Sequence, residues 1–445
     1  MRYLSRIFQP VITIPKNARI KNTEITCKSQ KLLLECGLIR PSSPGFFTIL
    51  PLAQRALDKL EAQIRVYMEA AGAQKISLPC LTSASLWMKT GRLQDGGSEL
   101  MKMKDRHGKE YLLGPTHEEA LADILADVSP LSYKQLPLLL YQIGNKYRDE
   151  LRPKHGLLRS REFIMMDAYG VHDSEECAHR MYDVVSECYT KLFEALQLNV
   201  HRVSAPPGFM GGAVSHEWQL AAAPGEDRLA LCAGCGRAAR GGGGGGDTCH
   251  SCGTKTDIVN SIEVGHTFVL GTKYSEPLGA MVTPPGGSPR PLFMSCYGLG
   301  LTRLLAAGLE ARSGEGRLRW AAGAAPYSLC VIPPKEGSVE WKSHGWDATR
   351  RLGAALGALA GYREDVLVDD RLTLTIGKRL MLADKMGYPY IVVCGKSTME
   401  SPPRYELHAT GAAPTAPTSV TLLTLDQLVQ HLQSEQHKQQ QIKTR

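Results

Sequence analysis

The sequence predicts an α+β domain over residues 41–325, followed by an α/β domain over residues 326–433. Residues 141–150 and 161–169 read as two strands, and the short loop between them makes them a hairpin. From Pro326 onward, short apolar strands alternate with helical stretches, which is typical of α/β layer domains. A chain of 445 residues, 43% hydrophobic and 22% charged, is long enough for two or three domains of ordinary globular composition.

The first long element of the α+β domain is a helix that begins near Leu52. Gly72 ends this helix, and residues 74–78 then read as a strand that stops at Pro79. Taken alone, the segment fits an ordinary core helix and strand. The apolar face of the helix consists of Leu52, Ala56, Leu60, Ile64 and Tyr67.

A second long helix is predicted over residues 174–197, with one apolar face that packs on the sheet. Two other segments are predicted to be loops. Residues 241–246 are six consecutive glycines, which cannot nucleate structure, and residues 284–289 are rich in Pro and Gly. The predicted apolar face of the helix comprises Cys177, Met181, Val184, Val185, Cys188, Leu192 and Leu196.

The α/β domain is predicted to hold three strands and three helices. Residues 434–445 are rich in Gln and Lys and are predicted to form a disordered tail. The strands are placed at 328–332, 366–368 and 390–393, and the helices at 346–359, 377–386 and 426–433.

The formal net charge of +8 is concentrated at the start of the chain. Residues 1–40 carry eight Lys and Arg against two Glu, whereas residues 41–325 carry 30 of each sign and residues 326–445 carry 14 against 12. An Arg-rich, acid-poor start suits a partial organellar transit segment, and a basic, frayed terminus explains the same residues.

The 12 cysteines do not indicate a disulfide protein, because the chain is long and has no secretory signal. Four of them form two Cys-x-x-Cys pairs, which match the ligands of a structural zinc ion. Free thiols on a degenerate loop are the alternative. The four residues are Cys232, Cys235, Cys249 and Cys252, within a Cys-rich insert of about residues 228–260. The sequence contains no run of 18 or more apolar residues, so no membrane-spanning helix is predicted.

Arginines around the predicted hairpin suit a nucleoside triphosphate. Arg148 and Arg159 flank the hairpin loop, and guanidinium groups bind phosphates in a bidentate manner. Phe163 offers a face to a base, and Arg303, at the start of a later helix, suits the other face by cation–π stacking. A surface ion pair between Arg148 and Glu150 explains those two residues without a ligand.

Three strings resemble motifs 2 and 3 of class II aminoacyl-tRNA synthetases: Tyr147-Arg148-Asp149-Glu150, Arg159-Ser160-Arg161-Glu162-Phe163 and Tyr297-Gly298-Leu299-Gly300-Leu301-Thr302-Arg303. Three more narrow the resemblance to the prolyl-tRNA synthetase family of bacterial and organellar type: Gly114-Pro115-Thr116-His117-Glu118-Glu119, Tyr133-Lys134-Gln135-Leu136-Pro137 and Glu263-Val264-Gly265-His266. The resemblance runs from about residue 30 to about residue 430.

This resemblance implies a class II catalytic domain with a mainly antiparallel sheet over residues 41–325 and an anticodon-binding domain over residues 326–433. The segment of residues 44–79 resembles motif 1, which implies a homodimer. Asp167 and Cys296 lie too close in sequence to enclose the large editing domain that many bacterial members carry.

The implied reaction is the ATP-dependent ligation of L-proline to tRNA(Pro) through a prolyl-adenylate, with Mg²⁺ as cofactor. Arg148 would bridge the α-phosphate and the proline carboxylate, and Glu150 would bind the adenine amino group. Arg159 and Arg303 would bind the outer phosphates, and Phe163 would stack on the adenine. The resemblance thus names Arg148, Glu150 and Arg303 as catalytic.

The resemblance also implies a proline pocket and a contact with the tRNA acceptor end. Thr116 and Glu118 would clamp the imino group, although Thr116 with Glu119 also reads as a helix capping box. Arg152 and Lys154 would contact tRNA, unless they form only a solvated basic loop. The pocket would be completed by Arg148, Met165, Asp167, His266 and Cys296, of which His266 also fits a structural role.

Two other functions fit parts of the sequence: a synthetase for another amino acid, such as threonine or serine, and a non-catalytic tRNA-binding paralogue. A paralogue is expected to lose motif arginines, whereas Arg148, Arg159 and Arg303 are all present. The basic start and the missing editing domain together predict the mitochondrial matrix, with the cytoplasm as the alternative location.

Overall fold

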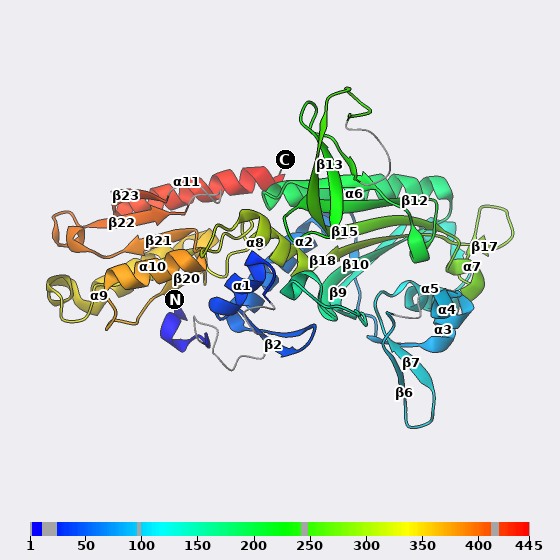
Figure 1. Ribbon diagram of the computed structural model, residues 1–445, viewed down its shortest axis with the longest axis horizontal. Coiled ribbons are helices and arrows are strands. Elements are labelled where there is room, and N and C mark those ends of the chain that lie inside the picture. Colours follow the sequence, from blue (N-terminus) through cyan, green and yellow to red (C-terminus); the bar gives the residue numbers. More distant parts are fainter. Residues whose placement is uncertain (1, 11–24, 96–98, 242–247, 411–417, 445) are drawn as a thin grey trace.

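The computed structural model describes residues 2–10, 25–95, 99–241, 248–410 and 418–444. Figure 1 shows a large domain around a long twisted sheet and a smaller C-terminal domain beside it. The predicted glycine loop at 241–246 lies outside the described residues, apart from Gly241. No helix among the described residues is both long and apolar enough to cross a membrane.

A nine-stranded sheet forms the centre of the large domain, and the prediction of a mainly antiparallel sheet is confirmed. All neighbouring strands are antiparallel except β4 and β9. The main order is β11 (Val200–Ser204), β12 (Val214–Ala221), β15 (Thr256–Gly271), β18 (Phe293–Gly300), β10 (Glu162–His172), β9 (Leu138–Tyr147) and β4 (Gln74–Lys75), and β15 also pairs with the hairpin of β13 (Asp227–Cys232) and β14 (Ala238–Arg240).

Helices α6 (Glu175–Ala195) and α8 (Leu301–Arg312) pack on this sheet, and α2 (Pro51–Ala70) packs on these two helices. Together they build the main hydrophobic core. Ser174 caps α6 by accepting a hydrogen bond from the Cys177 amide, as Ser does at many helix N-termini. The predicted face of α6 is wrong at Val184, which is 45% exposed. The buried face is centred near Tyr189, because the large rings of the helix turn toward the sheet.

Smaller elements surround the large sheet. One group forms a three-stranded sheet with its helices: β5 (Leu81–Ser83), β6 (Lys102–Lys104), β7 (Glu110–Leu113), α3 (Ala84–Lys89), α4 (Arg92–Asp95) and α5 (Glu118–Asp127). The others are α1 (Lys28–Glu35), β2 (Ile39–Ser43), β3 (Phe46–Ile49), β8 (Leu131–Ser132), α7 (Ser275–Leu278), β16 (Met281–Thr283) and β17 (Arg290–Pro291).

The C-terminal domain has a six-stranded sheet, ordered β1 (Arg2–Tyr3), β20 (Val366–Val368), β19 (Leu329–Ile332), β21 (Tyr390–Val393), β22 (Arg404–Ala409) and β23 (Ser419–Thr424). Its helices are α9 (Val339–Ala358), α10 (Ile376–Met386) and α11 (Leu425–Thr444). The three predicted strands are confirmed as the parallel centre of the sheet. A non-helical Gly345 (φ +57°) interrupts α9, which explains why the sequence predicted a helix only from Trp346.

Helix α11 contradicts the prediction of a disordered tail over residues 434–445 as far as Thr444. Gln, Lys and Glu are good helix formers, so a low-complexity composition of these residues prolongs the preceding helix.

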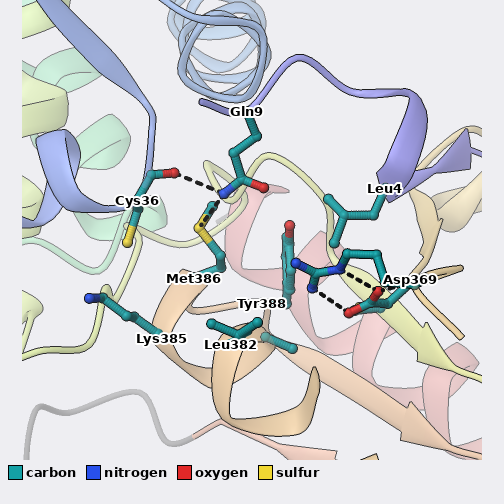
Figure 2. A pocket seen from close by; sticks show the side chains of 11 residues that line it. Leu4, Gln9, Cys36, Asp369, Leu382, Lys385, Met386 and Tyr388 are labelled. Carbon is teal, nitrogen blue, oxygen red and sulfur yellow. Dashed lines mark hydrogen bonds and ion pairs between the residues drawn. The ribbon is translucent and has the colours of Figure 1, made fainter. Parts of the chain in front are cut away.

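The start of the chain is part of the C-terminal domain, which contradicts the alternative of a frayed terminus for residues 2–10. Strand β1 pairs in parallel with β20, and the Ser5 amide donates to Asp370 Oδ1 at 2.9 Å. Figure 2 shows Gln9 between the two domains, where Nε2 donates to the Cys36 carbonyl at 2.8 Å. The pocket in this view is about 20 Å³, which is room for one water molecule at most.

Candidate active site

One large cavity, of about 360 Å³, opens over strands β10, β15 and β18 of the nine-stranded sheet. Helices α3 and α4 and the loop of residues 206–210 contribute to its wall. The cavity is lined by the following residues of the predicted site: Thr116, Glu118, Arg148, Phe163, Met165, Asp167, His266, Cys296 and Arg303. Segments far apart in sequence therefore bring both halves of the predicted site into one space.

Strand β10 supplies the floor because alternate side chains of a strand point to the same face. Phe163, Met165 and Asp167 all line the cavity, as the period of two predicts. Cys296 comes from the neighbouring strand β18 and is buried. Burial and the nearby Glu118 carboxylate raise the pKa of the Cys296 thiol, which makes it a neutral wall residue rather than a nucleophile.

Glu118 is buried at the N-terminus of α5, at one end of the cavity. The Thr116 hydroxyl donates to Glu118 Oε2 at 2.6 Å, and Arg92 Nη1 lies 3.4 Å from the same oxygen. The capping-box interpretation of Thr116 and Glu119 is wrong, since α5 has His117 at its N-cap and no side-chain cap. Glu119 instead binds Arg92 Nη1 at 3.0 Å. A hydroxyl and a carboxylate thus lie side by side, ready to accept hydrogen bonds from an ammonium group.

Arg92 is the cation that holds these two carboxylates. It is buried in the cavity wall, with its guanidinium 4.4 Å from the centre of the Trp87 ring. Burial lowers the pKa of Arg92, but the neighbouring Glu119, Tyr274 and Glu118 raise it overall, so the side chain stays charged.

Asp167 belongs to a buried polar network under the floor. Lys146 Nζ lies 2.7 Å from its Oδ1, and Gln142 Nε2 and the Tyr169 hydroxyl donate to its Oδ2 at 2.9 and 2.6 Å. Burial raises the pKa of Asp167, but His117 and Lys146 outweigh this effect and lower it overall. Asp167 is therefore a carboxylate with its oxygens already engaged, which suits support of the pocket more than direct binding.

The arginines lie at the other end of the cavity, because Arg148 is beside Phe163 near the start of β10. The His117 amide, next to Glu118, instead donates to the Tyr169 hydroxyl six residues further along the same strand. The Arg148 guanidinium lies 5.3 Å from the centre of the Phe163 ring. Arg303 donates from Nε to the Leu158 carbonyl at 2.9 Å and from Nη1 to the Glu263 carbonyl at 3.1 Å. Burial and the charge of Arg303 lower the pKa of Arg148, because two guanidinium groups face the same space. Such a pair attracts a polyanion.

His266 stacks on Phe268 with ring centroids 4.0 Å apart, and its ring nitrogens contact Ser215 Oγ at 2.7 Å and Glu263 Oε1 at 2.8 Å. Both nitrogens are therefore engaged by the protein. Burial raises the pKa of Glu263, but His266, Arg303 and Arg148 lower it to about 2. Glu263 is thus the negative charge that separates the histidine from the arginines.

Four residues of the predicted site do not line the cavity: Glu150, Arg152, Lys154 and Arg159. Glu150 accepts a hydrogen bond from Arg159 Nε at 2.8 Å, so the ion pair of Glu150 is with Arg159 and not with Arg148. Lys154 and Arg159 both form ion pairs with Glu226, and Arg152 is exposed.

The sequence did not single out Arg92, Glu99 or the loop of residues 206–210 as parts of the site. The loop carries a Pro-Pro-Gly turn signal, but nothing in such a signal points to a cavity. Arg92 lies far in sequence from the carboxylates that it contacts, so no spacing rule could have revealed it.

The Cys-rich insert rises from the sheet as the β13–β14 hairpin and the adjoining loop (Figure 1). Its four cysteine sulfurs lie within 4.8 Å of one another, with Cys232 and Cys252 3.4 Å apart and Cys235 and Cys249 3.6 Å apart. Four thiolates about 2.3 Å from one ion are about 3.8 Å apart, so this donor set fits a tetrahedral zinc site.

The comparisons with known proteins agree with this fold. Residues 101–312 match the family described as tRNA synthetase class II core domain (G, H, P, S and T), so the large domain is a class II aminoacyl-tRNA synthetase core. A probable mitochondrial proline–tRNA ligase of Homo sapiens is 45% identical over 91% of this chain and 86% of its own length. A proline–tRNA ligase of Sulfurimonas denitrificans is 34% identical over 88% and 92%. The chain belongs to the proline–tRNA ligase family.

Solved structures show the same fold at low sequence identity. Prolyl-tRNA synthetase of Giardia lamblia, in complex with prolyl-adenylate, has a TM-score of 0.75 and 15% identity, covering 90% of this chain and 74% of that one. The enzyme of Cryptosporidium parvum, complexed with L-proline and AMP, has a TM-score of 0.72 and 13% identity, covering 94% and 79%.

Proposed function

We propose that this protein ligates L-proline to tRNA(Pro), using ATP and passing through a prolyl-adenylate, with release of AMP and pyrophosphate. The observation that supports this most is a single cavity with an ammonium site at one end and two arginines at the other. Its two ends suit the two reactants, an amino acid and a triphosphate, whose reacting atoms must meet between them.

The amino-acid end would work by hydrogen bonding and charge. Thr116 and Glu118 accept hydrogen bonds from the two N–H groups of the secondary ammonium, while Arg92 holds the Glu118 carboxylate in place. Met165, His266 and Cys296 enclose the ring of the substrate. Asp167 stabilises the floor through its ion pair with Lys146.

The nucleotide end would work by stabilising negative charge. Arg148 holds the proline carboxylate against the α-phosphate, Arg303 binds the outer phosphates, and Phe163 stacks on the adenine. Mg²⁺ accompanies the triphosphate and offsets its charge. Glu150 binds the adenine and Arg159 the outer phosphates only after their mutual ion pair opens.

The remaining parts of the proposal concern partners and location. Arg152 and Lys154 would meet the tRNA acceptor end, because both are exposed in the loop between β9 and β10. Helix α2 would form a homodimer interface, as motif 1 does in the resembling family. The mitochondrial relatives support the mitochondrial matrix.

The test is ATP–pyrophosphate exchange with a panel of amino acids. We expect exchange with proline and not with threonine or serine. If only an amino acid other than proline supports exchange, the proline specificity is wrong. If no amino acid supports exchange, a non-catalytic tRNA-binding protein is favoured. Arg148→Ala should lower the proline-dependent rate by roughly 10²-fold or more, whereas Arg180→Ala, an exposed control on α6, should leave it unchanged.

A further inference from the structure

Glu226 lies in the turn between β12 and β13 and contacts the loop that joins β9 to β10. This loop, residues 148–161, is called the hairpin loop below. One oxygen of Glu226, Oε1, pairs with Lys154 Nζ, and the other, Oε2, accepts from Arg159 Nη1. A single carboxylate thus engages two cations of the hairpin loop at once.

The turn that carries Glu226 is fixed against the large sheet. Gly225 packs so closely on β15 that a Cβ atom there would lie 2.2 Å from the Ser261 carbonyl oxygen. Asn260 Nδ2 donates to the Ala223 carbonyl at 3.0 Å, and Asp227 lies opposite Ser261 in the sheet register. The sheet therefore fixes the position of the Glu226 carboxylate, and Lys154 and Arg159 of the hairpin loop bind to this fixed group.

The contact itself is of the reversible kind. The side chains of Glu226, Arg159 and Lys154 are 39%, 36% and 44% exposed. Exposed ion pairs contribute little to stability, so a stronger anion can replace the carboxylate. A triphosphate carries more charge than a carboxylate and accepts bidentate hydrogen bonds from arginine.

Arg159 is adjacent to the cavity although it does not line it. The carbonyl of the preceding residue, Leu158, accepts a hydrogen bond from Nε of the cavity residue Arg303 at 2.9 Å. The Arg159 guanidinium is held by two carboxylates that do not line the cavity, with Nε donating to Glu150 and Nη1 to Glu226. Release from these carboxylates is the change that makes Arg159 available to a phosphate.

We propose that Glu226 is a latch on the hairpin loop: it holds Arg159 and Lys154 in the ligand-free protein, and the phosphates of ATP compete with it for Arg159. The inference rests on the proposed function, in which Arg159 binds the outer phosphates. Glu226 is a positioning residue in this account, since it acts on the substrate only through Arg159.

Glu226→Gln tests the latch, because it removes the charge and keeps the size of the side chain. We expect the ATP dissociation constant, measured by equilibrium dialysis without an amino acid, to fall about two- to fivefold. The KM for ATP in proline-dependent exchange should fall by a similar factor with kcat unchanged. Glu187→Gln, which removes an exposed helix-surface carboxylate paired with Lys191, should change neither constant.

A double-mutant cycle separates the latch from a general charge effect. In an Arg159→Met background, Glu226→Gln should no longer alter ATP affinity. Unchanged or weaker ATP binding in Glu226→Gln alone, or an equal gain in the Arg159→Met background, would overturn the latch. Glu226→Asp shortens the side chain and keeps its charge, so its ATP affinity should lie between those of the natural chain and Glu226→Gln. This variant serves as the test if Glu226→Gln does not fold. Tighter ATP binding without proline-dependent exchange would retain the latch and reject only the proposed reaction.

Discussion

At the scale of single residues, burial decides which titratable groups make the structure sensitive to pH. His172 ends strand β10 in the core, where Nε2 contacts Ser295 Oγ at 2.9 Å and Nδ1 contacts Cys177 Sγ at 3.5 Å. It is fully buried, and burial lowers its pKa from the ordinary 6.5 to about 4. The folded protein therefore contains a neutral His172 at pH values where the unfolded chain is already protonated.

This difference predicts a loss of stability in acid. Between pH 6.5 and about 4 the unfolded chain binds more protons at this position, so stability is complete above 6.5 and decreases toward 4. The loss at pH 4 is about 3 kcal/mol at most, from about 1.4 kcal/mol per pKa unit. Denaturant unfolding from pH 7 to 4 should show a weaker pH dependence for His172→Gln than for the natural chain.

The matched control for this prediction is His107→Gln, because His107 is exposed in the turn between β6 and β7. Its pH profile should follow that of the natural chain. If His172→Gln kept the full acid sensitivity, the sensitivity would belong to other groups. The sequence shows the histidine, but only the tertiary structure shows that it is buried in the core.

At the scale of elements, the Cys-rich insert illustrates a site that local sequence specifies almost completely. The two Cys-x-x-Cys-Gly turns have the same geometry: the Gly236 amide donates to the Cys232 carbonyl at 2.9 Å, and the Gly253 amide donates to the Cys249 carbonyl at 2.8 Å. Both glycines have positive φ, of +69° and +71°, which favours glycine at each position. Two equivalent turns thus converge their sulfurs on one point.

The insert should bind about one zinc ion per chain. Elemental analysis of the purified protein measures this directly. The double variant Cys235→Ser/Cys249→Ser should lose the metal, because two of its four thiolate ligands are gone. Cys80→Ser changes an exposed cysteine outside the insert and should keep it. Purified natural protein without stoichiometric zinc would rule out the site.

At the scale of the whole molecule, helix α2 joins the two domains by charge. Arg55 Nη2 and Lys59 Nζ lie 3.1 and 2.6 Å from Oδ1 of Asp365, just before β20 of the C-terminal domain. The Asp365 side chain is only 10% exposed, and the Ser328 amide also donates to it at 3.2 Å. One carboxylate thus binds α2 of the large domain and the segment before β19 of the C-terminal domain.

Asp365→Asn should loosen this junction, because two partly buried cations lose their counter-charge. We expect a loss of about 1–3 kcal/mol, allowing for the partial exposure of both cations. Thermal unfolding and limited proteolysis near residues 325–327 would measure it. Glu400→Gln, which breaks an exposed pair with Arg404, should stay within about 0.5 kcal/mol of the natural chain. Equal stability of the two variants would show that the ion pairs of Asp365 do not stabilise the junction.

The elements that the amino-acid sequence predicted correctly are those with strong local signals. The helix after Leu52, the hairpin of β9 and β10 and the central strands of the C-terminal domain follow from hydrophobic period, which is a local property. The motif strings predicted Thr116, Glu118, Arg148 and Arg303 because each keeps its spacing within a short segment.

The contacts between these parts could be seen only in the folded chain. The tertiary structure assigned Arg92 to Glu118, Glu150 to Arg159 and Glu226 to the hairpin loop, since an ion pair between distant segments leaves no periodic pattern in sequence. It also placed the basic start on the edge of the C-terminal sheet, because strand pairing is a contact between backbones that are far apart along the chain. Local chemistry is encoded locally, whereas the partner of each charge depends on the path of the whole chain.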